Sequence, residues 1–353
     1  MVNLDNSQVY KKYDPQDMLE DIHNLPELCH QAWQIAINFE IPSDYSQINK
    51  VVVLGMGGSA IGGDIVATLV EDEACIPILT HRDYTLPSFV DDNTLIIASS
   101  YSGMTEETLS AFNQALNTNA KKLAITTGGR LKEMAQEKNI PVFSFDYRAQ
   151  PRAALPFSFL PILNFLYKLG FISDKSADLS ESLGVLKLLS REISESSPLS
   201  QNKAKQLAQG LYGKLAVIYG TGITAEVAHR WKTQLNENSK AWAFHETFPE
   251  LNHNAVVGYS FPPELASNIL VVMLRSIYLP QQILRRYQIT SQILEKANIG
   301  SCIIEGLGKS RLAQIMSLVM FGDYVSYFLA ILNSIDPTPV EVIDFLKSKL
   351  GNK

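Results

Sequence analysis

The spacing of hydrophobic positions changes near residue 50 of the chain. Before it, apolar side chains recur every three to four residues, as over residues 25–39, and this spacing predicts helices. After it come short, continuous apolar runs, each followed by a turn and a stretch with helical spacing. These runs are KVVVLG (50–55), IPILT (76–80), TLIIASS (94–100), KLAITT (122–127) and PVFSF (141–145). Apolar strands that alternate with helices are typical of a parallel sheet buried on both faces, so we predict an α/β lobe over residues 46–150.

The rest of the chain repeats this pattern after a helical connector, residues 151–213, and predicts a second lobe over residues 214–353. The tail is expected to be helical, with a break at DPTP (336–339). The apolar runs of the second lobe are KLAVIYGTG (214–222), AWAF (241–244), ILVVML (269–274) and SCIIEG (301–306). The sequence thus predicts an α/β fold of two doubly wound parallel-sheet lobes, with an N-terminal helical segment (1–45) and C-terminal helices. In such folds the ligand lies beyond the carboxyl ends of the strands.

The longest apolar stretch, residues 315–332, is long enough to cross a membrane, but Asp323 stands at its centre. A charge in the middle of a bilayer is costly, so we expect a buried core helix and no membrane contact.

Composition narrows the function classes further. Hydrophobic residues make up 46% of the 353 residues, which is ordinary for a globular protein with a sizeable core. The formal net charge of −6 argues against a nucleic-acid binder. The three cysteines, Cys29, Cys75 and Cys302, form no CxxC pair, and the N-terminus shows no apolar leader. We therefore expect a cytoplasmic protein without a disulfide framework or a thiolate metal site.

The first loop that could carry chemistry is GMGGSAIGGD, residues 55–64, between a predicted strand and a predicted helix. It contains G-x-G-x-x-A, a weak match to the dinucleotide fingerprint. Asp83, the acid that would bind a ribose, stands further along the chain than the fingerprint expects. Ser59 and the glycine amides at a helix N-terminus would suit a phosphate group equally well, and a tight turn that binds nothing is the third reading.

The second loop is SSYSGMTEETL, residues 99–109. Three hydroxyls, Ser100, Ser102 and Thr105, gather where a helix begins. Capping of the helix would explain one of them. Three hydroxyls together with free amides make a neutral cradle for phosphate, although the acidic pair Glu106 and Glu107 would have to point away. A third turn, TTGGRL (126–131), could border the same crevice or be a simple turn, and we favour the simple turn.

Six motifs, in order from residue 50 to the end, resemble the bifunctional phosphoglucose/phosphomannose isomerases, a family of sugar isomerase (SIS) domain enzymes. The motifs are GMGGSAIGGD, SYSGMTEETL, PRAAL, NENSK, ELNHN and DPTPVEVIDFLK. The resemblance implies two SIS lobes, a homodimer, no metal and no cofactor. It also implies interconversion of glucose 6-phosphate and mannose 6-phosphate with fructose 6-phosphate.

The resemblance further implies a role for individual residues. It gives substrate and phosphate binding to Gly58, Ser59, Ser100, Ser102 and Thr105. It gives catalysis to Arg152, Glu237, His253 and Lys347, with Lys349 as the alternative lysine and His253 contributed to the partner subunit's site. Met104 stands where the family commonly has an asparagine.

These residue types suit the chemistry of aldose–ketose isomerisation. A shielded carboxylate such as Glu237 can take a carbon-bound proton and return it, and a histidine such as His253 can give a proton to the ring oxygen and open the sugar ring. Arg152 can stabilise the charge of the enediolate. Taken singly, each has an ordinary reading: Glu237 as a solvated helix end, His253 as a structural histidine, Arg152 as a surface residue.

The sequence is also compatible with three other functions. The chain could be a sugar-phosphate sensor without turnover, an amino-sugar phosphate isomerase or a nicotinamide-dependent dehydrogenase. The HETFPE run (245–250) suggests a metal site, but its spacing is not that of HExxH and we predict no metal there.

Overall fold

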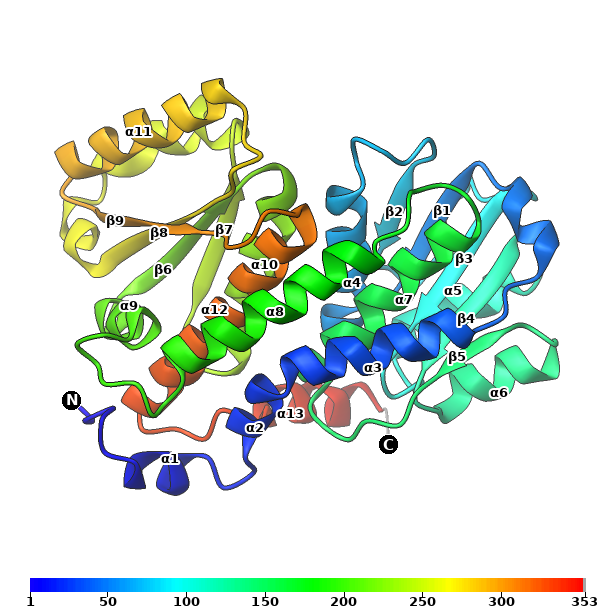
Figure 1. The fold of residues 1–353 in the computed structure, drawn as a ribbon, viewed down its shortest axis with the longest axis horizontal. Coiled ribbons are helices and arrows are strands. Elements are labelled where there is room, and N and C mark those ends of the chain that lie inside the picture. Colours follow the sequence, from blue (N-terminus) through cyan, green and yellow to red (C-terminus); the bar gives the residue numbers. More distant parts are fainter. Residues whose placement is uncertain (352–353) are drawn as a thin grey trace. The chain divides into compact units, whose positions relative to one another are not determined.

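The computed structural model describes residues 1–351, and the chain forms two compact units. The first-sheet unit is Leu25–Ala177, and the second-sheet unit combines Met1–Asn24 with Asp178–Leu350. Each unit contains one parallel sheet flanked by helices, which confirms the predicted α/β class (Figure 1). The finer division of the chain at residues 45, 150 and 213 stays a prediction.

The first-sheet unit holds a five-stranded sheet with the order β2-β1-β3-β4-β5. Its strands are β1 (Lys50–Leu54), β2 (Ile78–His81), β3 (Thr94–Ser99), β4 (Lys121–Thr126) and β5 (Val142–Ser144). Its helices are α3 (Leu25–Asn38), α4 (Gly57–Leu69), α5 (Glu106–Ala115), α6 (Gly129–Glu137) and α7 (Leu155–Lys168), with the 3-10 helices η1 (Ser43–Gln47) and η2 (Pro151–Ala154). All six residues of the central strand β3 are buried, which is why this strand is apolar without alternation.

The second-sheet unit holds a four-stranded sheet with the order β7-β6-β8-β9. Its strands are β6 (Leu215–Gly220), β7 (Ala243–Thr247), β8 (Ile269–Arg275) and β9 (Gly300–Glu305). Its helices are α1 (Gln8–Tyr13), α2 (Met18–His23), α8 (Ser176–Ile193, from Asp178 on), α9 (Lys203–Leu211), α10 (Ala225–Glu237), α11 (Gln281–Lys296), α12 (Arg311–Leu332) and α13 (Glu341–Leu350). Short 3-10 helices are η3 (Gly222–Thr224), η4 (Glu250–His253), η5 (Ala255–Ser260) and η6 (Pro263–Asn268). The break predicted at DPTP separates α12 from α13.

Helix α12 is the core of the second-sheet unit. It is the one helix within residues 1–351 that is long and apolar enough to cross a membrane, and its apolar window is fully buried inside the protein. The charge of Asp323 is compensated there: Arg230 Nη2 lies 3.0 and 3.1 Å from its two carboxylate oxygens, and Gln234 Nε2 donates to Oδ1 at 2.8 Å. A buried carboxylate with such partners supports the predicted core helix.

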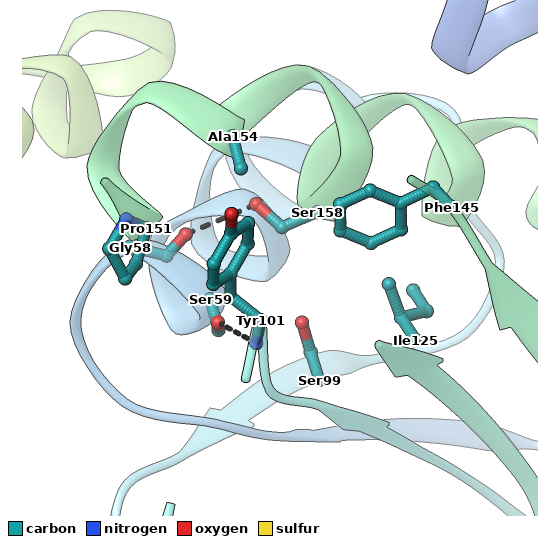
Figure 2. Close-up of a pocket in the computed structure, with 9 residues that line it drawn as sticks. All are labelled: Gly58, Ser59, Ser99, Tyr101, Ile125, Phe145, Pro151, Ala154 and Ser158. Carbon is teal, nitrogen blue, oxygen red and sulfur yellow. Dashed lines mark hydrogen bonds between the residues drawn. The ribbon is translucent and has the colours of Figure 1, made fainter. Parts of the chain in front are cut away.

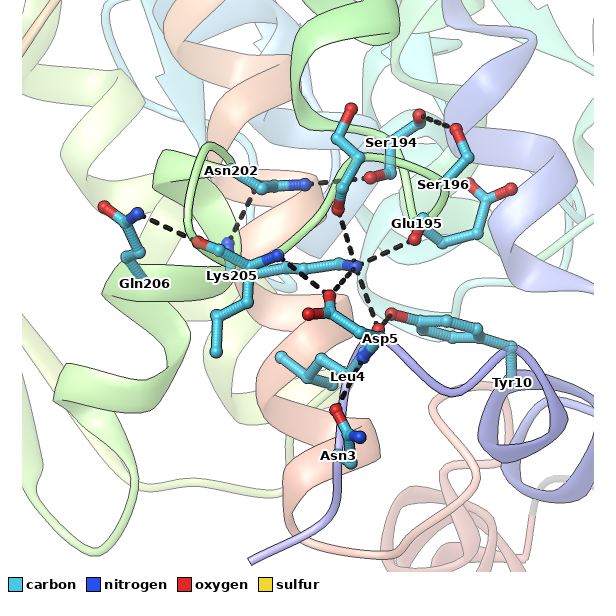
Figure 3. Close-up of polar contacts among 12 residues, drawn as sticks. Asn3, Leu4, Asp5, Tyr10, Ser194, Glu195, Ser196, Asn202, Lys205 and Gln206 are labelled. Atoms are coloured by element: carbon cyan, nitrogen blue, oxygen red, sulfur yellow. Dashed lines mark hydrogen bonds and ion pairs between the residues drawn. The ribbon is translucent and has the colours of Figure 1, made fainter.

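The N-terminal segment belongs to the second-sheet unit through a buried lysine on α9. Lys205 is fully buried, and its ammonium donates to the carbonyls of Leu4, Glu195 and Ser197 at 2.8–2.9 Å (Figure 3). It also pairs with the carboxylate of Asp5 at 3.1 Å. Lys205 therefore joins segments about 200 residues apart in the sequence.

Candidate functional site

The hydroxyl loop, residues 99–105, connects β3 to α5 in the first-sheet unit. Ser100 is fully buried, and its Oγ lies 2.9 Å from Oγ1 of Thr105. Thr105 is the residue that precedes α5, yet its side chain makes no capping bond to the helix. Ser102 is exposed, and its Oγ accepts a bond from the Met104 amide at 3.2 Å. Two of the three predicted hydroxyls are thus paired with each other at the N-terminus of α5, and the third lies on the rim of the loop.

The TTGGRL turn packs against the hydroxyl loop, so it is more than the simple turn favoured from the sequence. Thr127 donates from both its amide and its hydroxyl to the Tyr101 carbonyl, at 3.1 and 2.7 Å. Gly103 has φ +66°, and a Cβ atom at that position would lie 1.9 Å from the Gly128 oxygen. Only glycine fits this approach, because any Cβ atom would overlap the Gly128 oxygen, and the left-handed conformation further disfavours other residues.

Met104 and Glu106 both contact residues outside the hydroxyl loop. Met104 is 56% exposed, and its sulfur lies 3.3 Å from the Arg130 amide at the start of α6. Glu106 receives a long hydrogen bond from the Tyr84 hydroxyl, at 3.4 Å. Glu106 is exposed, so water screens its charge at the loop.

The GMGGS turn joins the hydroxyl loop to the turn that carries Arg152. Ser59 is buried, and its Oγ accepts a bond from the Tyr101 amide at 3.0 Å (Figure 2). A Cβ atom at Gly58 would lie 3.0 Å from the Pro151 oxygen and 3.2 Å from the Arg152 Cα. Gly58 is therefore explained by the close approach of η2 to the start of α4.

The cavity behind these turns is lined by Gly58, Ser59, Ser99, Tyr101, Ile125, Phe145, Pro151, Ala154 and Ser158 (Figure 2). Its volume is about 10 Å³, which is the size of a single water site and too small for phosphate. This cavity therefore cannot hold the phosphate group of a sugar phosphate.

Arg152 is 3% exposed, so the reading as a surface arginine is wrong. It lies on η2, directly before α7, and its guanidinium is within 3.5 Å of the Gln150 side-chain oxygen. Arginine stays charged when buried, so Arg152 places a permanent cation in the turn that approaches Gly58 at the start of α4.

The remaining predicted residues lie in the second-sheet unit. Glu237 is the last residue of α10 and is half-buried. It lines a groove of about 630 Å³ together with Asn236, Lys240, Ile335, Asp336, Pro339, Val340, Glu341, Val342 and Ile343. His253 ends η4 and is exposed, and Lys347 and Lys349 are exposed on α13. This unit thus places Glu237 in a groove whose lining includes neither His253 nor either lysine.

Comparison with known proteins decides the family. A family model described as "Bacterial phospho-glucose isomerase C-terminal SIS domain" matches residues 200–350. A bifunctional phosphoglucose/phosphomannose isomerase of Caldicellulosiruptor bescii is 44% identical over 95% of this chain and 99% of its own. One of Aquifex aeolicus is 36% identical over 88% of this chain and 93% of its own. The chain belongs to the bifunctional phosphoglucose/phosphomannose isomerase family.

The resemblance predicted from the six motifs is therefore confirmed, and with it the place of the chain among isomerases. Solved structures support the fold alone. The C-terminal domain of a glucosamine-fructose-6-phosphate aminotransferase from Francisella tularensis matches with a TM-score of 0.72 at 16% identity, over 91% of this chain and 98% of that domain.

Two further residues of the candidate site were not predicted from the sequence. Tyr101 donates its hydroxyl to the Tyr147 carbonyl at 2.6 Å and accepts from the Ala149 amide at 3.0 Å, so it ties the hydroxyl loop to the segment before Arg152. Lys240 lines the groove of Glu237. The only sequence signal for either was its place inside a motif, SYSG or NENSK.

Proposed function

We propose that the protein interconverts glucose 6-phosphate and mannose 6-phosphate with fructose 6-phosphate, without a metal or an organic cofactor. The observation that carries this proposal is the hydroxyl loop at the carboxyl end of β3, whose Tyr101 shares a cavity lining with the turn of the buried Arg152, in a chain of this isomerase family. We further propose that the enzyme works in the cytoplasm, in glycolysis or gluconeogenesis.

The phosphate anchor is assigned to the first-sheet unit. Ser100 and Thr105 hold their hydroxyls 2.9 Å apart, and the first-turn amides of α5, which begins directly after Thr105, point toward the same end of the helix. Ser59 supports the loop through the Tyr101 amide, and Ser102 contributes a solvent-facing hydroxyl. Hydroxyls and helix amides together bind a phosphate without needing a strongly basic surface.

The proton chemistry is assigned to Glu237 and His253. His253 would donate a proton to the ring oxygen and open the sugar. Glu237 would then remove the proton at carbon 2 of the aldose and return it to carbon 1, and Arg152 would stabilise the charge on the enediolate oxygen. Lys347, or Lys349 in its place, would assist at the same oxygens. A phosphate bound away from the reacting carbons turns binding energy into orientation.

We also propose that the enzyme is a homodimer in which His253 serves the active site of the partner subunit. The surface that follows His253 supports this assignment: Val257 and Phe261 are 80% and 82% exposed, and Leu265 is exposed as well. Apolar side chains gathered within a dozen residues of an exposed catalytic histidine are typical of a surface that is covered in the assembly.

The proposal is tested by a coupled assay on the three hexose 6-phosphates and on glucosamine 6-phosphate, with a chelator present. We expect turnover of the first three and a fall in kcat of about 10³-fold for Glu237→Gln, which cannot accept the proton. A normal rate for Glu237→Gln would remove glutamate as the base.

The same assay separates the alternatives. Turnover of glucosamine 6-phosphate alone would favour an amino-sugar isomerase. Binding of a hexose phosphate in a calorimeter without conversion would favour a sensor, and protein-dependent reduction of a nicotinamide would favour a dehydrogenase. For the dimer, inactive Glu237→Gln and His253→Ala chains are refolded together, and recovery of activity is expected if His253 acts across the interface.

A further inference from the structure

Lys240 links the end of helix α10 to the segment between α12 and α13. It stands three residues after Glu237 in a turn where its own φ is +50°. Its ammonium donates to the backbone carbonyl of Glu237 at 2.8 Å and to that of Pro337 at 2.9 Å. The two carbonyls are about 100 residues apart in the sequence, so this contact is a tertiary one made from the candidate base's own turn.

The buried side of the same turn is held independently of Lys240. Asn238 Nδ2 donates to Ser326 Oγ at 3.0 Å, and Ser239 Oγ donates to the Ser326 carbonyl at 2.6 Å. Asn333 Nδ2 closes the arrangement by donating to the Ser239 carbonyl at 3.0 Å. These contacts fix the turn on α12, so loss of the exposed lysine should leave the helix packing in place.

The segment on the other side of Lys240 borders the groove of Glu237. Asp336, Pro339 and Val340 line that groove, and the Thr338 amide is bound by the Asp336 carboxylate at 2.8 Å. Pro337 itself has no amide hydrogen with which to hold its own position. The bond from Lys240 therefore helps to set the position of the 336–339 segment relative to Glu237.

We propose that Lys240 is a positioning residue that sets the width of the groove between Glu237 and the 336–339 segment, and through it the balance between substrates that are epimers at carbon 2. The proposal rests on the proposed function, because it takes Glu237 as the base. Lys240 donates to two backbone carbonyls, one of them that of Glu237, so the role proposed for it acts through the backbone.

The test compares Lys240→Met with Lys240→Arg in the full-length protein. Methionine keeps the length of the stem and removes every donor, whereas a guanidinium can still donate to two carbonyls. Lys214→Met is the matched control, because Lys214 is exposed in the same unit. The measurements are kcat and KM for glucose 6-phosphate and for mannose 6-phosphate, together with the thermal midpoint of each variant.

For Lys240→Met, which loses both bonds, we expect kcat to fall about tenfold, because the Glu237 turn is then less well positioned. We also expect the ratio of the two kcat/KM values to change by about threefold or more, with Lys240→Arg restoring both and the thermal midpoint staying at that of Lys214→Met. An unchanged ratio would overturn the proposal, as would a loss of rate that follows a lowered thermal midpoint.

The failure of the proposed function would look different. A parent protein that does not convert any hexose 6-phosphate, or a fully active Glu237→Gln, contradicts the function or the base before Lys240 is considered. An active parent with an inactive Glu237→Gln, and Lys240→Met indistinguishable from Lys214→Met, contradicts the role of Lys240 alone.

Discussion

The two parts of the candidate site are built in different ways. In the first-sheet unit, two contacts hold the hydroxyl loop in place. Gly103 packs closely against Gly128 of the neighbouring turn, and the Tyr101 amide donates a hydrogen bond to Ser59 Oγ. In the second-sheet unit, Glu237 stands at the end of a helix, and His253 is exposed at the end of η4. The loop proposed to bind phosphate is therefore held by contacts within its own unit, whereas of the two proposed acid–base groups Glu237 is half-buried and His253 is exposed.

The strongest test of this contrast is Gly103→Ala. The added Cβ would lie 1.9 Å from the Gly128 oxygen at a φ of +66°, so the two loops would have to separate. We expect KM to rise at least about 100-fold for every hexose phosphate and the unfolding free energy to fall by about 2–4 kcal/mol. Steady-state kinetics and chemical denaturation measure the two effects.

Gly128→Ala is the matched control for this change. A Cβ atom at Gly128 would meet nothing within 4 Å, and φ there is 171°, which is extended backbone. If the two alanine variants behaved alike, the loop would not be held by this contact.

A smaller effect is expected from Thr105→Val, which removes the hydroxyl paired with Ser100 and keeps the shape of the side chain. In the proposed function this hydroxyl donates to the substrate's phosphate, so its loss should raise KM about tenfold. The value of kcat should stay close to that of the parent, because the phosphate of a hexose 6-phosphate is remote from carbons 1 and 2.

Thr118→Val is the control for the loss of a threonine hydroxyl, since its Oγ1 bonds only to the Ala115 carbonyl among the contacts described. A fall in kcat at unchanged KM for Thr105→Val would instead place Thr105 beside the reacting atoms.

Much of the fold was predictable because it follows from local pattern. The apolar run 94–100 contains the fully buried strand β3, and two hydroxyls of the loop, on Ser100 and Thr105, pair across five residues. Asp323 also allowed a prediction, because a charge in the middle of an apolar helix indicates a core helix with a buried partner for that charge. Arg230 is such a partner.

What escaped prediction depends on contacts between distant parts of the chain. No local pattern shows that Lys205 would bind the Leu4 carbonyl, or that Lys240 would reach Pro337. The burial of Arg152 also results from tertiary packing, because an arginine after a proline reads as a surface residue when only its neighbours in sequence are considered.

The smallest predicted effect concerns His245 on strand β7, outside the groove of Glu237. Its ring stacks on that of His229 with centroids 4.5 Å apart, and its Nδ1 has no hydrogen-bond partner among the described residues. Burial, and after it the charge of His229, lower the pKa of His245 to about 4; Glu226 acts in the opposite direction, and Lys232 adds a smaller lowering effect.

A histidine whose pKa is lower in the folded state resists protonation until the chain unfolds. Its contribution to stability is therefore complete above the unfolded pKa of about 6.5 and is lost as the pH falls toward 4. Since the ring is only partly buried, we expect about 1–2 kcal/mol rather than the full value of the pKa difference. His245→Phe keeps a flat ring and does not titrate, so its unfolding free energy should decline less than that of the parent between pH 6.5 and 4. If the unfolding free energies of the two proteins declined equally between pH 6.5 and 4, the acid sensitivity of the second-sheet unit would have another source.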